Sequence, residues 1–78
     1  MKPAPQILDQ YYNEMRWRIL SLAADFDRVQ RAEGGDKLIE SDARIVALRE
    51  CLEQVLSPDQ GRAERVQLTL SLPLGDPR

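Results

Sequence analysis

Residues 8–29 decide the fold of this chain, and they read LDQYYNEMRWRILSLAADFDRV. Their apolar members follow one another at alternating steps of four and three residues: Leu8, Tyr12, Met15, Ile19, Leu22, Phe26 and Val29. This spacing is the heptad pattern, whose a and d positions form one apolar seam along an α-helix. Pro5 suits a first helical turn, and Gly34-Gly35 can close a helix. The stretch therefore predicts a helix over about residues 5–32.

A second helix is predicted over about residues 38–56. Its apolar seam consists of Leu38, Ile45, Leu48, Leu52 and Val55. Two starts are open: Asp36 as the N-cap, or Ser41 as the N-cap with Asp42 in the first turn. Because few residues separate the two helices, we expect them to form an antiparallel hairpin closed along the heptad seam.

The C-terminal part of the chain changes its period. Residues 66–72 read VQLTLSL and alternate apolar with polar side chains, which predicts a β-strand that ends before Pro73. Residues 74–78 and the first few residues are expected to be short flexible ends. The predicted fold is therefore mainly α: one domain over residues 1–78, built from a helical hairpin and a short C-terminal strand.

This predicted architecture leaves apolar surface uncovered. The first helix has a second apolar line on the side opposite its seam, formed by Trp17, Leu20 and Ala24. The strand has no neighbour to pair with, so it would pair with its own copy across a twofold axis or with a strand of another protein. A single core in a chain below about 80 residues supplies only about 3–5 kcal/mol. We therefore expect a homodimer to complete the fold, with another protein as the alternative partner.

The interface of that dimer is expected to hold the surplus apolar side chains. They are Tyr11, Trp17, Leu20, Ala24, Leu68, Leu70 and Leu72. Trp17 has two interpretations: it anchors a protein interface, or it is covered by the strand of its own chain or of its twin.

The side chains on which most enzymes and metal sites rely are scarce. The chain has one cysteine, Cys51, and no histidine, so it has neither an internal disulfide nor the ligands of a structural zinc site. No histidine is available to activate the thiol. The acidic residues Asp25, Asp27, Glu50 and Glu53 fall on polar helix faces, where solvated surface explains them. We expect no enzymatic activity, no catalytic residues, no bound metal and no cofactor.

Charge argues against nucleic acid as the main partner. The chain carries 11 basic and 13 acidic side chains, and no segment is a basic arm. Arg16, Arg18, Arg28 and Arg31 near Trp17 support an alternative role as a nucleic-acid-associated accessory protein, but acidic residues share their helix. The leading hypothesis is a non-enzymatic protein–protein interaction module, a small adaptor or regulatory subunit.

The sequence also bears on location. No run of about 18 consecutive apolar residues is present, so no membrane span is expected. The first residues, MKPAPQ, lack the apolar region of a signal peptide. We therefore expect a cytoplasmic protein in a reducing environment.

Overall fold

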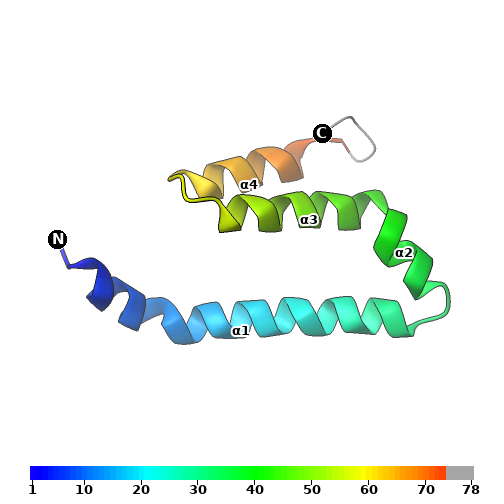
Figure 1. Ribbon diagram of the computed structural model, residues 1–78, viewed down its shortest axis with the longest axis horizontal. Coiled ribbons are helices and arrows are strands. Elements are labelled where there is room, and N and C mark those ends of the chain that lie inside the picture. The colour runs from blue at the N-terminus through cyan, green and yellow to red at the C-terminus, as the bar shows by residue number, and fades with distance from the viewer. Residues whose placement is uncertain (74–78) are drawn as a thin grey trace.

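The computed structural model describes residues 1–73, and within them the chain is mainly helical. The helices are α1 (Ala4–Arg31), α2 (Gly35–Ser41), α3 (Ala43–Leu56) and α4 (Arg62–Ser71). Figure 1 shows α1 as one long arm, α2 turning the chain, α3 running back, and α4 lying on the side of α3 away from α1. The flexible end predicted for residues 74–78 lies outside the described residues.

The first helix, α1, closely follows the heptad stretch, at Ala4–Arg31 against a predicted 5–32. Pro5 lies in its first turn, where no helical partner is needed for the missing N–H. Arg28 and Arg31 lie in its last turn, where positive charge is favourable at the negative end of the helix dipole. Gly34 follows in the left-handed conformation, with φ 80°, and turns the chain into α2.

The single second helix predicted over residues 38–56 is wrong, because the chain forms two helices there. The break is at Asp42, whose backbone is extended (ψ 133°) and whose Oδ1 accepts a 2.8 Å hydrogen bond from the Arg44 amide. An aspartate that caps the following helix in this way cannot also continue the preceding one. Of the two predicted starts, neither is the N-cap: α2 begins after Gly34, and α3 begins after Asp42 rather than Ser41.

The cap at Asp42 makes the α2–α3 junction sensitive to acid. Side-chain hydrogen bonding from Arg44 is the main reason that the pKa of Asp42 lies below its ordinary value of 3.8. Because the folded pKa is the lower one, the stabilisation is complete above pH 3.8 and is lost as the pH falls through the folded value. We expect Asp42→Ala to melt lower than the wild type at pH 7 and to lose less of its melting temperature between pH 5 and pH 3.

Asp42→Asn is the matched control for that measurement. Its amide oxygen can still accept from the Arg44 amide, but it carries no charge to lose. Thermal melts followed by circular dichroism should therefore place this variant between the wild type and Asp42→Ala at pH 7. Equal melting temperatures for all three proteins at pH 7 would contradict the cap.

The strand predicted at residues 66–72 is also wrong for its described part, because residues 66–71 belong to α4. A lone strand leaves its backbone groups unpaired, whereas a helix satisfies them within its own segment. In a helix, alternating residues fall about 200° apart, so the leucines of this segment do not share one face. Val66 and Thr69, three residues apart, are half-buried instead, while Leu68 and Leu70 are 62% and 56% exposed.

Two arginines fasten α4 to α3. The Nε of Arg65 donates to Oε1 of Gln54 at 2.7 Å, and its other nitrogens donate to the carbonyls of Asp59 and Gln60 in the connecting loop. Arg62 Nε donates to the carbonyl of Ser57 at 2.7 Å. These bonds satisfy loop carbonyls that accept no hydrogen bond within a helix, and they orient α4 along α3.

The core is small and lies on α3. Its buried apolar residues, in the described part of the chain, are Ile45, Ala47 and Cys51. Ala47 and Cys51 share one face of α3, and the thiol of Cys51 points toward the carbonyl of Val66 on α4, with 4.0 Å between sulfur and oxygen. The best-packed contact is therefore between α3 and α4, which leaves α1 as a separate arm.

Candidate interaction site

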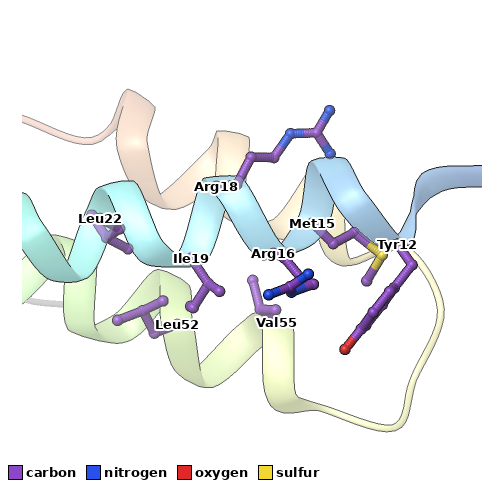
Figure 2. A pocket seen from close by; sticks show the side chains of 8 residues that line it. All are labelled: Tyr12, Met15, Arg16, Arg18, Ile19, Leu22, Leu52 and Val55. Carbon is purple, nitrogen blue, oxygen red and sulfur yellow. The ribbon is translucent and has the colours of Figure 1, made fainter.

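An open apolar groove separates α1 from α3. Its volume is about 650 Å³, and it is lined by Tyr12, Met15, Arg16, Arg18, Ile19 and Leu22 of α1 and by Leu52 and Val55 of α3. Figure 2 shows these apolar side chains on one side of α1, while Arg18 points the other way. No Cα atom of α1 lies within 8 Å of a Cα atom of α3. The two helices therefore face each other without packing.

The apolar walls of the groove remain exposed to solvent. Ile19 is 58% exposed and Val55 54%, although the heptad pattern placed both in a closed seam. Only Leu22 and Leu52 are half-buried. At about 25 cal/mol per Å² of apolar surface, covering such walls is strongly favourable.

The distance between α1 and α3 is set by α2. This helix lies between α1 and α3 in the chain and packs on both of them. Gly35 is buried against the end of α1: a Cβ there would lie 2.1 Å from the carbonyl oxygen of Val29. The short helix thus acts as a spacer, because its first residue is tied to the end of α1 and its last leads directly into the Asp42 cap.

The groove carries few charges that need solvent. Arg16 lies over the ring of Tyr12, with its guanidinium carbon 6.0 Å from the ring centre, a cation–π distance. Arg18 pairs with Glu14 at 3.0 Å on the outer side of α1. A helix from another chain that enters the groove would therefore meet a largely apolar lining, with the Arg16 guanidinium over the Tyr12 ring.

The predicted interface residues are mostly exposed but do not form one surface. Trp17 is 70% exposed and Leu20 54%, on the face of α1 opposite the groove, and Ala24 is half-buried on that face. Tyr11 is 46% exposed at the edge of the heptad seam. Leu68, Leu70 and Leu72 are exposed on and just after α4, where they no longer form the single face that a strand would give them.

The candidate chemical residues show ordinary environments. Cys51 is buried against α4. Asp25 pairs with Arg28 three residues away on the surface of α1. No cluster of three or more possible metal ligands occurs among residues 1–73. Two of the four arginines that suggested nucleic acid, Arg18 and Arg28, are thus engaged by acidic neighbours.

Sequence reasoning missed the groove and the face of α3 that holds the core. Ile45, a residue of the predicted seam, is buried, but Ala47 and Cys51 lie beside that seam and are buried as well. A small residue four positions before the cysteine was the available signal, since small residues allow close helix contact. The groove had no such signal, because the residues that line it are those expected to close a hairpin.

Comparison with known proteins adds no assignment. The chain matches no family model, and searches of curated proteins and of solved structures give no match. Among the residues described, no helix has both the length and the apolar character needed to cross a membrane. The groove and the opposite face of α1 are therefore the features from which a function can be argued.

Proposed function

We propose that this protein is a non-enzymatic protein–protein interaction module, a small adaptor or regulatory subunit that acts as a homodimer. The observation that carries the proposal is its surplus of exposed surface. A chain of 8.9 kDa exposes 6718 Å², whereas a compact monomer of that mass exposes about 4,800 Å². The difference of about 1,900 Å² is surface that association can remove.

The shape of the molecule supports the same interpretation. The Cα radius of gyration is 15.2 Å, against about 11.5 Å for a compact domain of 78 residues. The molecule measures 47 × 28 × 17 Å, so α1 and the α3–α4 pair lie in one extended helical layer. Such a layer, one helix thick, cannot bury apolar residues on both sides by itself.

Two apolar faces on α1 suit two kinds of contact. The groove face holds the heptad seam, which is suited to another helix of the same pattern. The opposite face holds Trp17 and Leu20, and exposed tryptophan is the side chain most enriched in interface hot spots. A dimer that uses the groove face would present two copies of the Trp17 face to a partner, which is the arrangement of an adaptor.

Sedimentation equilibrium on the purified chain tests this proposal. We expect a mass of twice 8.9 kDa at micromolar concentration, with dissociation on dilution. Trp17→Ala should leave that mass unchanged, and it should reduce the proteins recovered with the tagged chain from the native cell extract. Ser21→Ala, on the same helix, is the control for recovery and should behave as wild type.

Two results would overturn the proposal. A chain that sediments at 8.9 kDa at every concentration, with a sharp melt, is no homodimer. A chain that recovers only itself from the extract over a range of salt concentrations, whether or not Trp17 is replaced, is no adaptor.

A further inference from the structure

The N-terminal half of α1 offers a heptad seam with nothing on it. Leu8 is 52% exposed, Tyr12 53%, Met15 48% and Ile19 58%. The C-terminal half differs, because Phe26 and Val29 are half-buried at the end where α1 meets α2. The free part of the seam is thus about two heptads long and begins before the groove.

We propose that a second copy of the chain covers this seam in one specific register, an inference that rests on the proposed homodimer. The two α1 helices run antiparallel about a twofold axis that passes between Asn13 and Glu14. Leu8 then packs against Ile19 of the partner subunit, and Tyr12 against the partner subunit's Met15. Each of these contacts occurs twice, because a twofold interface is self-complementary.

The area to be covered favours a second copy as the occupant. The surplus of about 1,900 Å² per chain exceeds the about 800 Å² that each partner buries in an interface of standard size. The whole surplus of two chains is about 3,800 Å², and even about half of it falls within the range of obligate homodimers, whose interfaces bury about 2,000–5,000 Å². A single short peptide in the groove would leave the seam before Tyr12 exposed.

Charge distinguishes the proposed register from the others that pack a positions on d positions. With Tyr12 and Ile19 at a positions, Asp9 and Arg16 are e positions, and Tyr11 and Arg18 are g positions. In an antiparallel pair, e positions lie beside e positions of the partner and g positions beside g positions. The proposed register places Asp9 beside the partner's Arg16, and Tyr11 beside the partner's Arg18, twice each. Opposite charges thus flank the apolar contacts on one side, while Arg18 keeps its pairing with Glu14 on the outer side of α1.

The two registers shifted toward the C-terminus of α1 are less favourable. Shifting by one heptad, so that Met15 packs on the partner's Ile19, sets Arg16 beside the partner's Arg16 and Arg18 beside the partner's Arg18. Like charges at these positions repel. Shifting by two heptads pairs Ile19 with the partner's Leu22. This register uses the part of the seam where Phe26 and Val29 are already half-buried, and it leaves Leu8 exposed to solvent.

In the proposed register the partner's α1 also helps to fill the groove. The partner's Leu8 lies against Ile19, which forms the groove wall opposite Leu52 and Val55. Those α3 side chains then gain a neighbour that their own chain does not supply. The groove is completed only by the second copy, which explains why α1 and α3 can stand apart in one chain.

A charge-exchange experiment tests the register. Asp9→Arg alone and Arg16→Asp alone each create two like-charge pairs per dimer, so each should raise the dimer dissociation constant about tenfold or more. Mixing the two variants in equal amounts creates heterodimers in which both pairs are opposite again, and the mass should return to that of a dimer. Asp27→Arg, the same charge change away from the seam, should leave the dissociation constant unchanged.

The outcomes separate the register from the dimer. If the wild type is a dimer but neither Asp9→Arg nor Arg16→Asp weakens it, or if the mixture does not recover, the register is wrong and the homodimer stands. A wild-type chain that stays at 8.9 kDa overturns both, and a helix of another protein would then be the occupant of the groove. Far-ultraviolet circular dichroism of each variant shows that its helices are intact.

Discussion

Replacing Ala47 by glutamate is expected to unfold the chain. Ala47 is 3% exposed, the most buried side chain of the core, and lies on the face of α3 that packs on α4. A carboxylate there would be desolvated without a partner, at a cost of several kcal/mol. That cost is comparable with the about 3–5 kcal/mol that a core in so small a domain supplies. We expect the helical circular dichroism signal at 25 °C to fall to that of an unfolded chain.

Val46→Glu is the matched control for this substitution. The neighbouring side chain is 39% exposed and lies about 100° around α3 from Ala47, so its carboxylate reaches water. Both substitutions add one negative charge; helix propensity falls slightly at Ala47 and rises slightly at Val46, each by about a few tenths of a kcal/mol, so burial is the main difference. We expect Val46→Glu to keep its helical signal and to melt within a few degrees of the wild type. Similar melts for the two variants would show that α4 does not cover Ala47.

Replacing Gly35 by alanine is expected to have the next largest effect, by separating α2 from the end of α1. The new Cβ would lie 2.1 Å from the carbonyl oxygen of Val29 and 2.5 Å from that of Gln30. Both obstacles are backbone atoms, so the turn itself has to move. We expect a loss of about 3 kcal/mol in the free energy of unfolding, the upper end of the usual cost of overpacking.

Gly34→Ala separates steric conflict from conformational strain. Gly34 has a φ of 80°, but a Cβ there would meet no atom within 4 Å. The expected cost is that of the left-handed conformation alone, about 1 kcal/mol. Urea denaturation of the two variants side by side gives both values. A Gly35→Ala protein as stable as Gly34→Ala would mean that α2 does not rest on the end of α1.

If the distance between α1 and α3 depends on Gly35, Gly35→Ala also affects association. A displaced α2 changes the distance between α1 and α3 and hence the width of the groove. The seam residues Leu8 and Tyr12 lie far from this turn along α1 and are not altered. Sedimentation of Gly35→Ala therefore reports whether the groove contributes to the interface in addition to the seam.

The sequence by itself determined α1. Its heptad spacing, Pro5 in its first turn and the glycine pair after its end are local signals, and local periodicity specifies a helix whatever packs on it. The same reasoning predicted one helix over residues 38–56, and the part of it from residue 43 onward is α3. It did not resolve the break at Asp42, because an aspartate can serve equally as a cap or as a residue of the first turn.

Tertiary structure decided the rest. Residues 66–71 have a strand period, yet they are helical because residues 1–73 contain no strand with which they could pair. The bonds from Arg65 to Gln54 and to the loop hold α4 on α3. The same packing buries Ala47 and Cys51 rather than Val55. Whether an apolar seam closes within a chain or stays open depends on the spacing of its helices, and α2 sets that spacing through contacts that periodicity does not encode.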